Sequence, residues 1–95
     1  MWKHKRHLGD GNTCVVLLLQ IASGETITIN PGIILRNSGA IYNSGIIKNL
    51  GTITNFGIID SRYGIITNSG TIKNSGTASL LDANIKNSGT IGPFE

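Results

Sequence analysis

Isoleucine recurs at a short, regular interval along most of the chain, and most isoleucines lie a few residues after a glycine. Between Asn37 and Asp60 the sequence reads NSGAIY, NSGIIK, NLGTIT and NFGIID, which is four consecutive six-residue units. A chain that repeats itself at a fixed short period buries its apolar residues by stacking units, not by collapsing around one centre. The pattern therefore predicts a repeat architecture whose core grows with each unit.

Each unit predicts one short strand and one corner. In the unit at 68–73, Thr71, Ile72 and Lys73 form a strand in which the isoleucine points to one side and its neighbours to the other. Residues 68–70 (Asn-Ser-Gly) form the corner, where turn residues are favoured. Units this short are too short for useful antiparallel hairpins, but they can pair with equivalent strands one coil above and below. We predict an all-β fold, a parallel β-solenoid (β-helix) of short strands with Asn-x-Gly corners and about three to four coils.

The unit also predicts which isoleucines are buried and which are exposed, because neighbouring residues of a strand point to opposite sides. The predicted inward column is Ile41, Ile47, Ile53, Ile59, Ile66, Ile72, Ile85 and Ile91, with Ala78 as a small exception. The predicted outward row is Ile46, Ile58 and Ile65. Isoleucines exposed in a row on a flat β face indicate a packing surface rather than scattered surface apolarity.

The length of one coil is less constrained than the fold. The repeat glycines occur at positions 32, 39, 45, 51, 57, 64, 70, 76 and 89, and their spacing repeats with a longer, 25-residue period. A coil of four units would explain this period directly and would place Gly39 one coil from Gly64. We favour this 25-residue coil. An 18- to 19-residue coil of three units is the second alternative, and a coil of two units also divides the long period.

Residues 1–23 lie outside the repeat, and residues 24–95 form the predicted solenoid domain. The segment combines a basic start, MWKHKRH, with the most apolar run of the chain, Cys14–Ala22. This order resembles a secretory leader. The alternative, which we favour, is a first strand that caps the end of the repeat stack. The apolar run is too short to span a bilayer as a helix, so we expect no membrane span. Asn30-Pro31-Gly32 is a predicted turn.

Charge and composition exclude several classes of function. The net charge is +3, but three cations lie in the first six residues, and from residue 7 onward five cations face five acids. A neutral repeat with few aromatic residues does not form a nucleic-acid groove. Cys14 is the single cysteine, and no metal-ligand spacing is present. His4 and His7 are predicted to belong to a solvated tail. No histidine or acid pair lies near a repeat serine to activate it. We therefore predict no enzyme, no metal and no cofactor.

Two Thr-x-Thr pairs, at Thr26/Thr28 and Thr52/Thr54, are the remaining candidate feature. Regular threonine rows on a flat face would be typical of an ice-binding protein. The corresponding positions in neighbouring units are Ile46, Lys48, Thr71 and Lys73, so the row is broken. Ordinary strand propensity accounts for these threonines better.

The NSGxI repeats over residues 32–91 resemble the Gly/Asn-rich β-helical stalks of secreted bacterial adhesins, of the filamentous haemagglutinin and autotransporter passenger type. The resemblance implies a right-handed coil, an extracellular or cell-surface location and a structural or adhesive role. We expect a self-assembling structural subunit, a homo-oligomer or fibre built by coil stacking, because a short solenoid exposes unpaired strand edges. The alternative is an adhesin-type binding module that contacts carbohydrate or a surface, and ice binding ranks below it.

Overall fold

The computed structural model of the protein describes residues 6–7, 12–75, 79–81 and 85–93, and these residues form twelve strands and no helix. The strands are β1 (Arg6–His7), β2 (Thr13–Ile21), β3 (Thr26–Ile29), β4 (Ile34–Asn43), β5 (Ile46–Asn49), β6 (Thr52–Asn55), β7 (Ile58–Asp60), β8 (Ile65–Asn68), β9 (Thr71–Asn74), β10 (Ser79–Leu81), β11 (Ile85–Asn87) and β12 (Thr90–Pro93). Only the pairing of β1 with β2 is antiparallel among them. The fold is an all-β parallel β-solenoid of about four turns, which confirms the predicted fold class.

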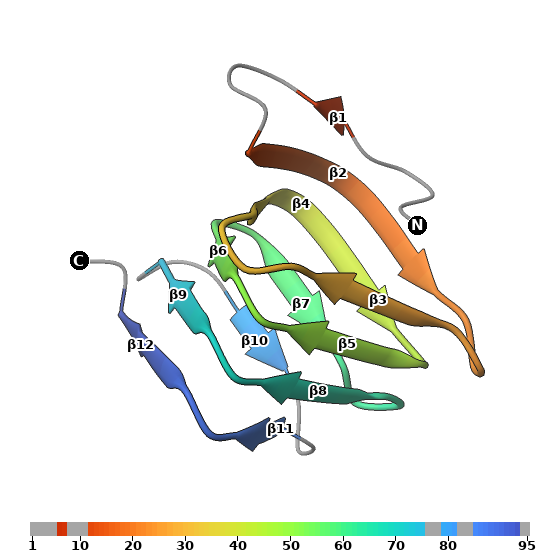
Figure 1. Cartoon of the computed structure of the whole chain (residues 1–95). Coiled ribbons are helices and arrows are strands. Elements are labelled where there is room, and N and C mark those ends of the chain that lie inside the picture. The colour runs from red at the N-terminus through yellow and green to blue at the C-terminus, as the bar shows by residue number, and fades with distance from the viewer. Residues whose placement is uncertain (1–5, 8–11, 76–78, 82–84, 94–95) are drawn as a thin grey trace.

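The solenoid has three sides, and the strands of each side stack directly on one another (Figure 1). Face I consists of residues 13–16 of β2, residues 34–37 of β4, then β6, β9 and β12. Face II consists of residues 18–21 of β2, residues 40–43 of β4, then β7 and β10. Face III consists of β3, β5, β8 and β11. Because β2 and β4 bend around a corner without interruption, faces I and II belong to one eight-stranded sheet.

The strand register fixes the coil length. Ile41 pairs with Ile59, and Ile47 pairs with Ile66. Corner side chains that hydrogen-bond between neighbouring coils lie 18 or 19 residues apart in the sequence. The predicted 25-residue coil is therefore wrong, and the alternative of three units per coil is confirmed. The coils are slightly longer near both ends of the described chain, since Thr13 pairs with Ile34 and Ile58 pairs with Ser79.

The reason is that three units, not four, close the ring. The inward aliphatic side chains of the three sides pack together and fill the interior of the ring, as the close packing of protein interiors requires. Three six-residue units account for the shorter of the two spacings, and the longer corner at residues 61–64 adds the extra residue between Asn49 and Asn68 and between Asn55 and Asn74. The 25-residue period is a similarity between stretches of sequence that lie on different sides of the solenoid.

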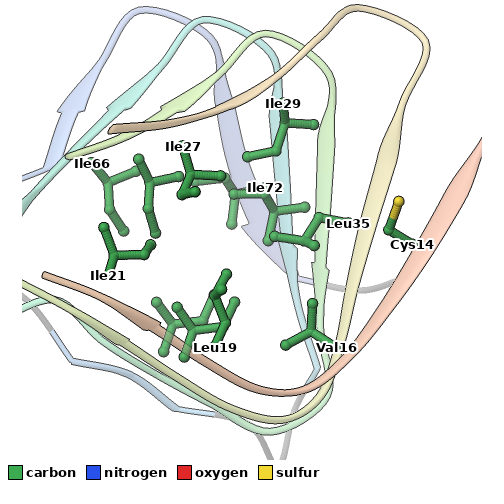
Figure 2. Close-up of a cluster of buried hydrophobic side chains, with 13 residues drawn as sticks. Cys14, Val16, Leu19, Ile21, Ile27, Ile29, Leu35, Ile66 and Ile72 are labelled. Atoms are coloured by element: carbon green, nitrogen blue, oxygen red, sulfur yellow. The ribbon is translucent and has the colours of Figure 1, made fainter. Parts of the chain in front are cut away.

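The core is a column of aliphatic side chains inside the ring of strands, as Figure 2 shows. The inward isoleucines that are buried are Ile41, Ile47, Ile53, Ile59, Ile66 and Ile72, and Ile85 is partly buried against them. Ile91 was expected inside but is 36% exposed, because no strand in the described part of the chain follows β12 on face I. Ala78 lies outside the described residues.

The first coil begins within the segment at 1–23, because β2 supplies two of its sides. Cys14, which is free and buried, lies in this coil. The predicted turn at Asn30–Ile33 is confirmed by a 3.1 Å hydrogen bond from the Ile33 N–H to the Asn30 carbonyl oxygen, with Gly32 at φ +85°. The ring of Pro31 fixes its own φ at the second position of the turn, and Gly32 accepts the positive φ that the third position requires.

Most repeat glycines are needed for close packing between coils and not for the positive φ of a tight turn. Positive φ occurs only at Gly24 and Gly32 among the described residues. The glycines at the corners of later coils lie directly against the backbone of the preceding coil. At Gly57, for example, an added Cβ would overlap the carbonyl group of Gly39. The repeat therefore needs glycine for close stacking of coils, and the Gly39–Gly57 contact again excludes a 25-residue coil.

We expect Gly57→Ala to destabilise the fold by about 1–3 kcal/mol or more, because the new methyl group forces neighbouring coils apart. Gly92→Ala is the matched control, since a Cβ at Gly92 meets no atom within 4 Å. Urea unfolding of the two variants measures the difference. Equal stability of Gly57→Ala and Gly92→Ala would show that the coils do not stack in this register.

Candidate functional site

Asparagine side chains at the three corners point inward and form columns that run from coil to coil. Each column is a chain of side-chain hydrogen bonds of 2.8 Å between neighbouring coils. The columns are Asn37–Asn55–Asn74 at corner I–II, Asn43–Ser61 at corner II–III, and Asn49–Asn68–Asn87 at corner III–I. We refer to these columns as the asparagine ladders. Their buried asparagines are Asn37, Asn43, Asn49, Asn55 and Asn68.

Asn49 shows how one amide group is used. Its Oδ1 accepts the N–H of Gly51 at 3.2 Å, two residues further along the same corner. Its Nδ2 donates to Oδ1 of Asn68 at 2.8 Å and to the carbonyl oxygen of Thr71 at 3.0 Å, both in the next coil. Both amide hydrogens are therefore paired. Among the described residues no buried side-chain nitrogen or oxygen lacks a partner, so burial of these amides carries no unsatisfied polar group.

The Asn-x-Gly sequence follows from this geometry. The side-chain oxygen of asparagine can accept a hydrogen bond from the backbone N–H two residues further along the chain. The short side chain favours this local turn. Glycine at that third position supplies the N–H and, having no Cβ, lets the corner lie against the coil beneath. Serine can replace asparagine as an acceptor, as Ser61 does for Asn43.

The two ends of the solenoid differ in these corners. In the first coil the ladder positions are apolar: Val16, Ile21 and Ile29 lie opposite Asn37, Asn43 and Asn49, and all three are buried. The ladders therefore stop at the N-terminal end. At the C-terminal end Asn87 is exposed, Ile91 is partly uncovered, and β11 has no further strand beside it within the described residues.

The three outward isoleucines do not form one row. Ile46 pairs with Ile65 on face III, where Ile46 is 39% exposed and Ile65 is half-buried. Ile58, which is 41% exposed, lies on face II beside Ala40. Residues two units apart lie on different sides of a three-sided coil, and this separates Ile58 from the other two.

Face II is the most apolar outer surface. Seven large hydrophobic residues of the described chain are exposed, and five of them belong to face II or its two corners. These five are Leu17, Leu18, Tyr42, Ile58 and Tyr63. The sequence analysis missed this surface. A three-unit coil aligns Ala40 with Ile58 and would have revealed part of the surface, whereas Leu18 joins this column through a first coil that the repeat does not describe.

The corner at residues 61–64 departs from the repeat. Ser61 takes the ladder position, the corner is longer than the Asn-x-Gly corners, and Tyr63 is 80% exposed. Beside it the Arg62 guanidinium contacts the Asp60 carboxylate through Nε at 3.0 Å and Nη2 at 2.8 Å. These side-chain hydrogen bonds hold the pKa of Asp60 below its ordinary value and raise the pKa of Arg62. The pair forms a fixed, neutral polar group next to an exposed ring.

Other candidate chemistry is sparse in the described part of the chain. It contains no cluster of three or more residues suited to hold a metal ion. Thr26 and Thr28 pair with Ile46 and Lys48, so the threonine row of face III is broken where the sequence indicated. Within residues 6–7, 12–75, 79–81 and 85–93, no helix is long and apolar enough to cross a membrane.

Comparison with known proteins adds no family. No family model, curated protein or solved structure matches this chain. What is established is the parallel β-solenoid of about four turns with its stacked asparagines. Any functional argument therefore rests on the ladders, the two ends and the outer faces.

We expect Asn49→Ala to lower the free energy of unfolding by about 2–4 kcal/mol, because three hydrogen bonds are lost and their buried partners are left unpaired. Asn30→Ala is the control, since Asn30 is exposed and lies outside the ladders. Chemical denaturation gives both values. A similar small effect at the two positions would contradict the role assigned to the buried amides.

Proposed function

We propose that the protein is a structural, self-assembling β-solenoid subunit of an extracellular fibre or surface layer, joined by stacking of coils. The single observation that carries the proposal is the contrast between the two ends of the solenoid. Among the described residues, the first coil buries its apolar corner residues and ends the ladders, whereas the last coil leaves Ile91, the edge of β11 and the side chain of Asn87 exposed. Uncovered strand edges favour pairing with another chain.

Strand geometry supports β11 as part of the joining edge. In a parallel strand, alternate residues direct their N–H and C=O groups to opposite neighbours. The carbonyl oxygen of Asn68 accepts the N–H groups of Ser88 and Gly89 in the following coil, at 2.9 and 3.1 Å. Asn87 pairs with Asn68 in register and therefore directs the same groups toward the open side. A further strand placed there would extend face III.

The N-terminal end is a poor acceptor for such a strand. In the hydrogen bonds between coils the ladder amides donate toward the C-terminal side, so an incoming Asn87 would meet Ile29, which offers no side-chain acceptor. Leaving that donor unpaired would cost about 1–3 kcal/mol. In addition, β1 already pairs with β2 at Cys14 and Val15. A joint between two C-terminal ends avoids both penalties and gives a two-fold contact between identical surfaces.

The proposed location and role also draw on the resemblance of the repeat to secreted adhesin stalks. We propose the extracellular location on this resemblance. The proposal includes no catalytic step.

We expect Ile91→Lys to abolish end-to-end joining, because the charge would be buried without a partner when a second copy covers the open end. The fold should tolerate the change, since Ile91 is 36% exposed in the single chain. Electron microscopy and sedimentation velocity at increasing concentration measure assembly. Ile46→Lys is the matched control, because Ile46 is 39% exposed and lies away from the end. A wild-type protein that stays monomeric at high concentration would rule out the proposed function.

A second candidate is an adhesin-type module that binds carbohydrate, and the corner at 61–64 favours it. Tyr63 exposes a ring whose face can pack against a sugar, and the Asp60–Arg62 pair beside it offers hydrogen-bonding groups. A glycan array probed with the wild-type protein and with Tyr63→Ala separates this candidate from the first. Binding that the substitution removes would favour the module.

A further inference from the structure

We propose that face II is a second contact surface, at which it packs against face II of another copy of this chain. The inference extends the structural role proposed above. The side-by-side contact does not depend on that role, but its consequence, the growth of a fibre, does. It commits to one occupant, a second copy placed side by side. The observations that carry it are the apolar side chains of face II and the distribution of charge over the three faces.

The apolar side chains of face II are continuous across the coils. Leu18, Ala40 and Ile58 are register neighbours in the first three coils and form one outward column. Tyr42, which is 43% exposed, stands in the adjacent outward column between Gln20 and Asp60. An apolar column beside a tyrosine has the composition of the centre of a protein interface, where aromatic side chains are enriched and charges are depleted.

Charge separates face II from the other two faces. Face I presents Arg36 and Lys73, and face III presents Lys48 and Lys86, all of them exposed. Two copies that met through face I or face III would bring these like charges together, which is unfavourable. The charged groups at face II and its corners, among the described residues, include Asp60 and Arg62, which already neutralise each other. Face II therefore contacts a copy of itself without bringing cations together.

The shape of the surface also suits this partner. A β face presents side chains in regular rows, and two such faces pack about 10 Å apart with interdigitated side chains. The β2, β4 and β7 strands of face II are in register, so their outward columns run straight along the solenoid. A two-fold axis parallel to this face would place the Leu18–Ala40–Ile58 column of one copy against the same column of the other.

Two different two-fold contacts on one subunit build an open chain when the two axes do not intersect, and a closed tetramer when they cross at right angles. The end contact alone joins two copies and stops, and so does the face II contact alone. When both act, each pair formed through the ends is linked to the next through face II. The side-by-side contact is thus the element that turns pairs into a fibre or a layer.

The test compares Ile58→Lys with Ile46→Lys. The two isoleucines occupy the same place in their six-residue units and are 41% and 39% exposed, but they lie on face II and face III. We expect Ile58→Lys to raise the dissociation constant of the side-by-side contact by roughly tenfold or more, because each contact carries the substitution twice. Sedimentation velocity measures the oligomers, and circular dichroism confirms that both variants are folded.

The full set of variants distinguishes the two contacts. We expect assemblies larger than dimers for wild type and Ile46→Lys, dimers for Ile58→Lys and for Ile91→Lys, and monomers for the double variant I58K/I91K. If Ile58→Lys assembles like wild type, face II serves another occupant and the inference is overturned, while the contact between two C-terminal ends stands. If Ile91→Lys has no effect but Ile58→Lys gives monomers, the end contact fails and the side-by-side contact holds. A monomeric wild type overturns both.

Discussion

The side-chain amide of asparagine at the corners is the constraint on which the whole solenoid depends. A three-sided coil turns so sharply that polar groups at its corners are buried inside the ring. An asparagine at the ladder position pairs its oxygen within its own coil and its nitrogen with the next coil, as Asn49 does. Each bond contributes about 0.5–1.5 kcal/mol net, and an unpaired buried group costs more than that. A buried asparagine at a corner therefore requires hydrogen-bond partners such as those of the ladder.

The need for glycine at the corner and for isoleucine in the strand of each unit follows from the same constraint. Because the amide ties neighbouring coils together at the corner, the backbones approach so closely that a Cβ at Gly57 or Gly70 would overlap the preceding coil. The inward isoleucine of each strand then fills the triangular section, as Ile53 and Ile72 do on face I. Each unit is consistent with its neighbours at every level, which is the property that makes a sequence specify one structure.

Much of this could be predicted from the sequence, and the errors have physical causes. The six-residue period gives the strands, the corners and the buried isoleucines from Ile41 to Ile72, because alternation along a strand is local. Coil length is not local. It depends on how many strands close a ring, and the long-period similarity of the glycine pattern did not reveal that Gly39 stacks on Gly57. The prediction of one row containing Ile46, Ile58 and Ile65 is wrong for this reason, because coil length determines which residues are neighbours on an outer face.

The ends and the outer faces required the structure for the same reason. Val16, Ile21 and Ile29 are recognised as ladder positions only once the register places them opposite asparagines. The columns Leu18–Ala40–Ile58 and Gln20–Tyr42–Asp60 likewise become visible only once the coil length is known, and Leu18 and Gln20 lie outside the six-residue repeat. Residues outside the six-residue repeat thus distinguish the first coil from the last described coil. The register likewise distinguishes the apolar face II from faces I and III, which carry exposed cations.

Hydrogen exchange of the asparagine side-chain amides, followed by NMR, tests the central claim most directly. Both Nδ2 hydrogens of a ladder asparagine are bonded to the next coil in the structure, as at Asn37, Asn49 and Asn68. The account predicts that these side-chain protons exchange as slowly as backbone amides of the core, while those of exposed Asn30 exchange at the rate of a free side chain. Uniformly fast exchange of all the asparagine side chains would contradict it.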